Sequence, residues 1–129
     1  MKNEMNNFGK FEIGNEQALS SEDENERKVL KAINEEYGDL FLSTRITSGS
    51  RCGFANSGTI VYLANLHSRN RYRVVIRRNY RHDRGQTGHV DLTQDLNPSA
   101  RVNLGCSVYG MTPGSITRYS YQIISETRI

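Results

Sequence analysis

The chain has 129 residues and a formal net charge of +3 at pH 7, and 36% of its residues are hydrophobic. This length is typical of a single domain. The sequence contains no stretch of about 20 apolar residues that would cross a bilayer, and its polar first residues lack the apolar core of a secretory signal. We therefore expect one domain without a membrane segment, located in the cytoplasm.

The charges are unevenly distributed along the chain. Residues 1–38 contain 5 Lys and Arg against 9 Asp and Glu, whereas residues 39–129 contain 12 Arg, no Lys and 5 acidic residues. Seven of these arginines lie between Arg69 and Arg84. An asymmetry of this kind bears on binding partners rather than on fold. Arginine in particular binds carboxylates and phosphates through two parallel hydrogen bonds.

The first elements in chain order are a polar leader and a helix. Residues 1–20 are mostly polar and are expected to be flexible. Residues 21–37 are predicted to be helical, because Ser21 and Glu24 have the spacing of a capping box and Gly38 is a natural stop. The apolar stripe of this helix consists of Val29, Leu30, Ile33 and Tyr37.

From residue 40 onward the apolar spacing changes to two, with turn residues between short alternating runs, as in antiparallel strands. The predicted strands cover residues 40–47, 59–66, 71–77, 89–93, 101–109 and 117–125. Short strands at regular spacing favour an antiparallel β-sandwich of six or seven strands. The expected domain is residues 21–129, a single β-sandwich that carries the helix 21–37 at its N-terminal side.

The last third of the chain contains a turn at Asn97 and Pro98, then the run VNLGCSV, then the run YSYQI. This order resembles the late strands of immunoglobulin-like sandwiches, although the chain has no tryptophan, which members of that family bury in their core. The resemblance implies an immunoglobulin-like or similar sandwich and no particular activity.

The two cysteines, Cys52 and Cys106, are 54 positions apart and have no Cys or His at ligand spacing, so we expect no metal site and no cofactor. Cys106 alternates with Val102 and Leu104 and is expected in the core. Because cytosolic thiols are kept reduced, we expect both cysteines to be free; a disulfide between them is the alternative.

The arginine-rich strand has two faces. If Tyr72, Val74 and Ile76 point into the core, then Arg73 and Arg77 stand on the opposite face. The alternation gives Arg71 the same outward parity, and Arg101 and Arg118 extend this face if their strands are adjacent.

Arg78 and Tyr80 have inward parity. We expect the strand either to end at Arg77 or to contain a bulge, which places Arg78, Tyr80 and Arg81 near an end of the sheet. The predicted anion-binding or partner-binding residues are Arg71, Arg73, Arg77, Arg78, Tyr80, Arg81, Arg101 and Arg118.

Several functions fit such a surface. The favoured hypothesis is a non-enzymatic binding module (an adaptor, inhibitor or accessory subunit) whose partner is an acidic protein. The alternative is a module that binds nucleic acid or a nucleotide, with Tyr80 or Tyr109 stacking on a base. A small ribonuclease using His82 and His89 is a third hypothesis. Arginines on an exposed strand also keep a sheet soluble without any ligand. The acidic residues 22–26 are an internal candidate for masking the arginines, and a free sheet edge is a route to a homodimer.

Overall fold

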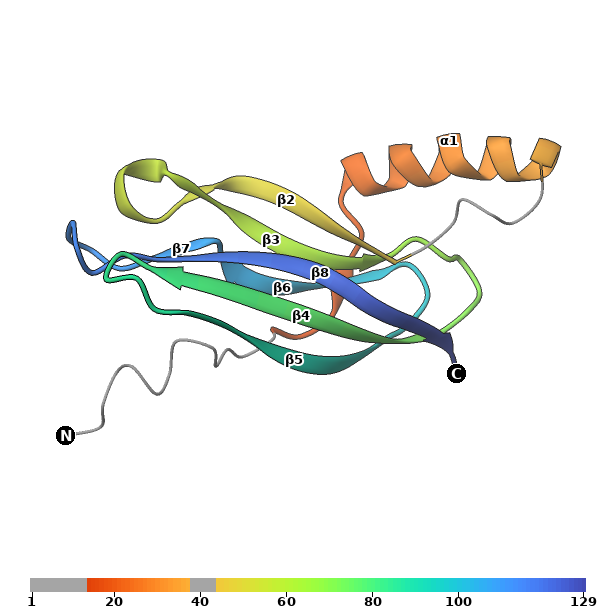
Figure 1. Cartoon of the computed structure of the whole chain (residues 1–129). Helices are drawn as coiled ribbons and strands as arrows, with labels where there is room; N and C mark the ends of the chain where they lie inside the picture. Colours follow the sequence, from red (N-terminus) through yellow and green to blue (C-terminus); the bar gives the residue numbers. More distant parts are fainter. Residues whose placement is uncertain (1–13, 38–43) are drawn as a thin grey trace.

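Two four-stranded antiparallel sheets pack face to face, and one helix lies on the outer side of the first sheet (Figure 1). The computed structural model describes residues 14–37 and 44–129. The elements are β1 (Gln17–Ala18), α1 (Ser21–Tyr37), β2 (Thr44–Cys52), the 3-10 turn η2 (Phe54–Asn56), β3 (Gly58–Asn65), β4 (Tyr72–His82), β5 (Thr87–Leu96), β6 (Ala100–Cys106), β7 (Val108–Tyr109) and β8 (Thr117–Arg128).

The strand order is β1-β6-β3-β2 in the first sheet and β5-β4-β8-β7 in the second. The predicted β-sandwich with one helix is therefore confirmed. The region predicted as one strand over residues 101–109 is divided, because β6 belongs to the first sheet and β7 to the second. The short strand β1 has no counterpart in the sequence prediction, and residues 40–43 of the first predicted strand lie outside the described residues.

The chain changes sheets at Ser107. Its amide donates to the carbonyl of Thr59 in β3 (2.9 Å), and its hydroxyl accepts a hydrogen bond from the Thr59 amide (3.0 Å). Its carbonyl accepts from the amide of Tyr119 in β8 (2.8 Å). One residue thus forms backbone hydrogen bonds with both sheets.

The core between the sheets is apolar, as the period-two alternation predicts. Leu63, Val74, Ile76 and Val102 are fully buried in it. The complete buried cluster consists of Val61, Leu63, Val74, Ile76, Leu96, Val102 and Leu104. Both sheets contribute, so the inner faces interlock in the manner of an aligned sandwich.

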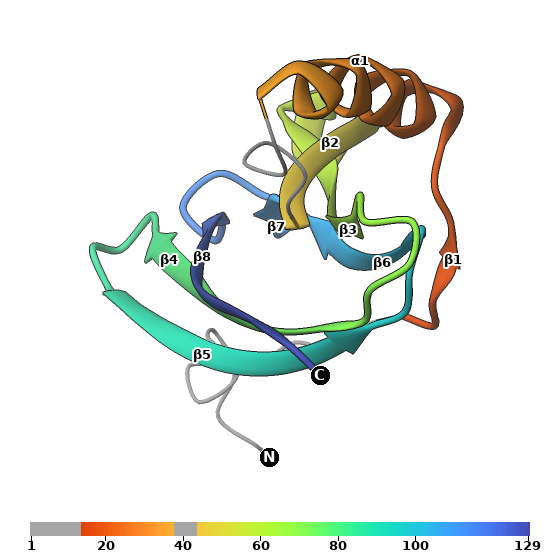
Figure 2. The ribbon, with the colours of Figure 1, turned by 90° about the vertical axis from the view of Figure 1, so that its right-hand side faces the viewer.

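Helix α1 has the predicted bounds, but Ser20 is its N-cap instead of Ser21. The Ser20 hydroxyl accepts from the Asp23 amide (3.1 Å), and the Asp23 carboxylate accepts from the Ser20 amide (3.1 Å). The capping box is thus shifted by one residue, with Asp in the place of Glu. Leu30 packs with Leu19, Ala64 and Leu66. Figure 2 shows the helix over β2 and β3, seen from the end of the sheets. Val29, predicted in the same stripe, is 61% exposed.

Residues 14–20, which the sequence assigned to a flexible leader, pack against β6. The Gly14 amide donates to the Asn103 carbonyl (3.2 Å), and Gln17 and Ala18 pair with Arg101 and Ala100. Residues 1–13 of that leader lie outside the described part of the chain. None of the helices in the described ranges is long and apolar enough to cross a membrane.

A disulfide joins Cys52 to Cys106, so the expectation of two reduced thiols is wrong. Cys52 ends β2 and Cys106 ends β6, and these strands flank β3 on either side. Both cysteines therefore arrive at the same end of the first sheet. The spacing in sequence does not reveal this proximity, because it depends on the strand order.

Candidate interaction surface

The outward arginines of β4 are paired with aspartates of the neighbouring strand β5. Arg73 lies opposite Asp95, and Arg77 lies opposite Asp91. Each guanidinium donates twice, from Nε and Nη2, to the two carboxylate oxygens; the distances are 2.8 and 3.1 Å for Arg73 and 2.8 and 3.0 Å for Arg77. The predicted row of guanidinium groups is therefore a ladder of bidentate ion pairs.

These pairs change the titration of the aspartates. The hydrogen bonds from Arg77 lower the pKa of Asp91 from its usual value, and those from Arg73 lower the pKa of Asp95. At neutral pH each arginine of the ladder thus has an ionised carboxylate beside it.

Arg71 lies at one end of this ladder. Its Nε donates to Asn97 Oδ1 (3.1 Å), and its Nη2 is 3.8 Å from the carboxylate of Asp95. Two guanidinium groups, those of Arg71 and Arg73, therefore share one aspartate.

Arg81 and Arg118 form the other end, where they lie directly opposite each other on β4 and β8. Arg118 donates to Asp83 (2.8 Å). Arg81 is exposed and has no carboxylate partner in residues 14–37 and 44–129. The sequence could not show whether the strand of Arg118 lies beside the arginine-rich strand. In the structure, β8 and β4 are neighbours.

Arg78 is buried inside the sandwich, only 5% exposed, and the expectation that it lies at a sheet end is wrong. Strand β4 continues to His82 without a bulge; the register shift in this pairing falls in β8 between Ile123 and Ser125. The guanidinium carbon lies 3.5 Å from the ring centroid of Tyr119 and 5.9 Å from that of Tyr121. These rings allow an inward arginine, because aromatic faces attract a cation.

Burial perturbs the groups around Arg78. Desolvation lowers the pKa of the guanidinium and raises the pKa of the Tyr121 hydroxyl to about 12. The Tyr121 hydroxyl donates to the Leu104 carbonyl (3.2 Å), which ties β8 to the first sheet.

Tyr80 lies near the end of β4, as expected, and His82 is the last residue of that strand. Tyr80 lies over Gly88, where any side chain would collide with the phenol ring. His82 is buried, and its Nδ1 accepts a hydrogen bond from the Arg84 amide (3.1 Å). His89 lies opposite Asn79, on the outward face of the second sheet. The two histidines proposed for a ribonuclease therefore stand on opposite faces of the sheet and do not converge on one substrate.

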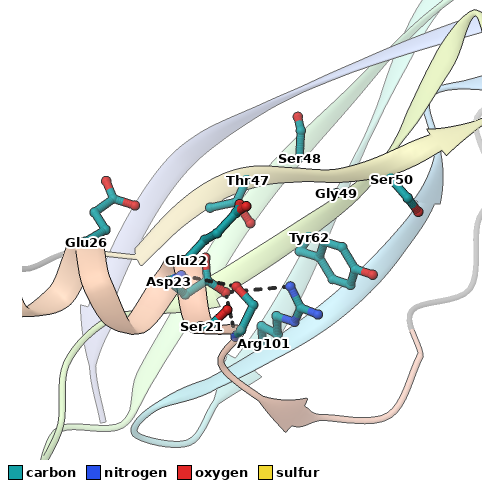
Figure 3. Close-up of a pocket in the computed structure, with 11 residues that line it drawn as sticks. Ser21, Glu22, Asp23, Glu26, Thr47, Ser48, Gly49, Ser50, Tyr62 and Arg101 are labelled. Carbon is teal, nitrogen blue, oxygen red and sulfur yellow. Dashed lines mark hydrogen bonds and ion pairs between the residues drawn. The ribbon is translucent and has the colours of Figure 1, made fainter.

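Arg101 belongs to the first sheet and does not extend the arginine ladder. Its Nη1 is 3.6 Å from the Asp23 carboxylate of α1, and its guanidinium lies 3.7 Å from the ring centroid of Tyr62 (Figure 3). The neighbouring Glu26 pairs with Arg45 of β2. The acidic start of the helix thus binds arginines of the first sheet instead of masking those of β4.

A pocket of about 360 Å³ lies between the start of α1 and strand β2 (Figure 3). Its lining is mostly hydroxyl and carboxylate groups; the residues are Ser20, Ser21, Glu22, Asp23, Glu26, Thr47, Ser48, Gly49, Ser50, Tyr62 and Arg101. Its central charged groups, Asp23 and Arg101, bind each other, so this region attaches the helix to the sheet.

Three connections meet at one end of the sandwich, on the left in Figure 1: η2, the β4–β5 turn (residues 83–86), and the β7–β8 connection together with the last residue of β7 (residues 109–116). We call this the loop end. Asp83 links two of the connections, because its carboxylate accepts from the amides of Gly114 (3.1 Å) and Ile116 (3.2 Å) as well as from Arg118. The disulfide joins the ends of β2 and β6 here, and Gly53, which follows Cys52, lies close to Val108 of β7.

The loop end carries three large apolar side chains that are exposed to solvent. Met111 is 86% exposed, Tyr109 is 69% exposed and Phe54 is 37% exposed. Sequence reasoning had named Tyr109 only as a stacking residue and had missed the other two. The available signal was an apolar residue placed beside turn-forming Gly and Pro, as in GMTPG.

The fold and these surfaces define a small β-sandwich with one attached helix and a basic, partly apolar loop end. Comparison with known proteins gave no match to a family model, to a curated protein or to a solved structure. The function proposed below therefore depends on the geometry alone.

Proposed function

We propose that this protein is a non-enzymatic binding module, acting as an adaptor, inhibitor or accessory subunit, and that its partner is an acidic protein. One observation supports this most strongly: the exposed Arg81 and Arg84, for which no carboxylate partner is found among the described side chains, lie at the same end of the sandwich as the exposed Tyr109 and Met111, because Asp83 bonds the β4–β5 turn to the β7–β8 connection. Tyrosine, methionine and arginine are the side chains enriched in protein interfaces.

The arginine ladder favours a protein over a nucleic acid as the partner. A phosphate backbone that follows β4 would meet Asp91 and Asp95 beside Arg77 and Arg73, at hydrogen-bond distance from each guanidinium. Phosphates would be repelled by these carboxylates as well as attracted by the arginines. A protein surface, with charges of both signs, fits such a ladder without displacing its ion pairs.

The disulfide bears on where the protein works. Disulfides form and persist in oxidising compartments and are rare in the cytosol. The Cys52–Cys106 bond therefore makes an oxidising compartment a better proposal than the cytoplasmic location expected from the sequence.

The test is a fluorescence anisotropy titration with three labelled probes: a random copolymer of glutamate and tyrosine, a single-stranded DNA and a single-stranded RNA. We expect binding of the copolymer, with the DNA and RNA bound more weakly at the same salt concentration. Tighter binding of DNA or RNA, with an affinity that falls linearly with the logarithm of salt, would favour the nucleic-acid alternative. Cleavage of the RNA in the same tubes would show an enzyme, and no binding of any probe at low salt would refute a basic binding surface.

A further inference from the structure

We infer that the loop end, and not the outer face of the second sheet, is the docking surface for an acidic protein segment that carries an apolar anchor. This inference rests on the proposed function and specifies where the partner binds and by which chemistry. Of the β4 arginines predicted from the sequence, it keeps Arg81 near the end of the strand and leaves out Arg73 and Arg77.

The first argument is the grouping of exposed apolar side chains. Val29, Ile124 and Ile129 are exposed singly elsewhere, which is ordinary for a folded protein. Tyr109 instead ends β7, Met111 follows two residues later in the β7–β8 connection, and Phe54 lies on the neighbouring η2. Exposed apolar groups that gather on adjacent loops and are bordered by charged residues mark interaction sites.

The second argument is that the loop end is held in one conformation. Asp83 fixes the β7–β8 connection at the Gly114 and Ile116 amides. Within the connection, the Ser115 amide and hydroxyl both donate to the Thr112 carbonyl (3.1 and 2.7 Å). A surface that is already ordered loses little conformational entropy when a partner binds, so a given contact area yields more affinity. Loops held on a rigid sandwich are a common place for recognition.

The third argument is charge. The loop end and the strand ends beside it contain Arg51, Arg81, Arg84 and Arg118 against the single acidic residue Asp83. Arg51 donates to the carbonyl of Asn56 in η2 (3.3 Å), so its positive charge is not offset by a carboxylate there. The complementary partner is therefore acidic.

The loop end differs from the rest of the second sheet in how its arginines are paired. Arg73 and Arg77 already have bidentate partners, so a new acidic ligand gains less from them than from Arg81 and Arg84. An acidic segment with an aromatic or aliphatic side chain would use both kinds of contact at the loop end. The glutamate–tyrosine copolymer is the simplest probe with both features.

The experiment compares two double variants with two matched controls, using the full chain with its disulfide intact. R81E/R84E reverses two loop-end charges, and R69E/R128E reverses two exposed arginines at the opposite end, which also lack a carboxylate partner in the described ranges. Y109S/M111S removes the apolar anchors, and V29S/I124S removes two exposed apolar side chains elsewhere. All four change surface side chains only, so folding is expected to persist and is checked by circular dichroism.

We expect R81E/R84E and Y109S/M111S each to weaken copolymer binding by about tenfold or more, the scale on which interface anchors act, whereas both controls stay within about threefold. Amide chemical shifts on titration should move in residues 53–57, 83–86 and 109–116. Equal losses in loop-end variants and controls, or shifts centred on Arg73 and Arg77, would overturn the loop end as the docking surface while leaving the binding function standing. Absence of copolymer binding by the unmodified protein would refute both proposals.

Discussion

Arg78 is a charged residue whose position in β4 points its side chain into the core, and the strand continues through it without a break. The guanidinium lies against Tyr119, and its burial would be costly without a favourable electrostatic environment. The hydrocarbon stem also fills space between the sheets. Arg78 is therefore a structural cation of the core, and its contribution to stability should exceed that of the exposed arginines on the same strand.

We predict that R78A lowers the free energy of unfolding by about 2 kcal/mol or more, since desolvated cation–π contacts reach that magnitude and a cavity is added. R77A, which removes an exposed ion pair from the neighbouring position, should cost less. R78M keeps most of the volume of the hydrocarbon stem, so its loss in the free energy of unfolding should lie between those of R78A and R77A. Urea unfolding monitored by circular dichroism measures all three, and an R78A loss no larger than that of R77A would contradict the structural role.

Side-chain alternation predicted the direction of many residues in β4 but not their partners. Arg73 and Arg77 do face outward, and Val74 and Ile76 face inward, because the backbone of a strand alternates regardless of its neighbours. Their pairing with Asp95 and Asp91 depends on the register between β4 and β5, which no local pattern contains. The site predicted from the sequence therefore had more net positive charge than the structure shows, because it left out these aspartates.

At the level of elements, the disulfide is the covalent link between two strands that are not neighbours in the sheet. It closes a long loop of chain from β2 to β6, and such a cross-link restricts the unfolded ensemble. Its position at the loop end means that it also holds η2 beside β7.

We predict that C52A/C106A lowers the free energy of unfolding by about 4 kcal/mol, the value that the chain-entropy model gives for a loop of this length. The measurement is urea unfolding with and without a reducing agent. The unmodified protein in reductant should resemble the double variant, and the variant itself should not respond to reductant. An unmodified protein that is equally stable in both conditions would show that the bond contributes nothing.

Helix α1 depends on a small satellite cluster rather than on the main core. Leu30 is its buried anchor, and only Leu19, Ala64 and Leu66 surround it in that cluster. The helix also has polar contacts with the sheet, such as the ion pair between Asp23 and Arg101. The helix should therefore be lost more easily than the sheets.

We predict that L30A costs about 2–3 kcal/mol, as expected for a buried Leu truncated in a small cluster, and lowers the helical signal at 222 nm more than the β-sheet signal. V29A is the matched control, because the adjacent side chain is 61% exposed and its removal should change stability by less than about 0.5 kcal/mol. Equal effects of the two substitutions would mean that the helix is not anchored through Leu30.

The extent of the elements was predicted well where local signals are strong. The helix bounds agree with residues 21–37, since the capping residues and the acidic first turn act locally. Strand β4 is longer than predicted because the rings of Tyr119 and Tyr121, distant in sequence, make inward positions for Arg78 available. Strand β1 could not be predicted, since two residues carry no periodicity and it exists only by pairing with β6.

For the whole molecule, the ion pairs on the second sheet make stability depend on pH. Hydrogen bonds from Arg118, Arg77 and Arg73 lower the pKa of Asp83, Asp91 and Asp95 in the folded state. A carboxyl group whose pKa is lowered by folding stabilises the protein above its unfolded pKa of about 3.9. This contribution is lost as the pH falls through the lower folded value.

We predict that the free energy of unfolding changes little from these groups above about pH 5 and falls steadily below about pH 4. D91N/D95N should be less stable than the unmodified protein near neutral pH and should show a shallower decline in acid. E22Q, which alters an exposed helix carboxylate without an ion pair in the described residues, should leave the slope unchanged. Urea unfolding between pH 2.5 and 7 tests this, and parallel curves for D91N/D95N and the unmodified protein would contradict it.

Ser107 has a mechanical consequence for the whole fold. Because its backbone bonds to Thr59 on one side and to Tyr119 on the other, the first and second sheets share a continuous hydrogen-bonded seam at that corner, as the wall of a barrel does. Sliding one sheet along the other would break bonds on both sides of this residue at once. At the opposite end, the Thr44 amide of β2 donates to the Glu126 carboxylate of β8 (2.6 Å), so hydrogen bonds oppose sliding of the sheets at both ends of the sandwich.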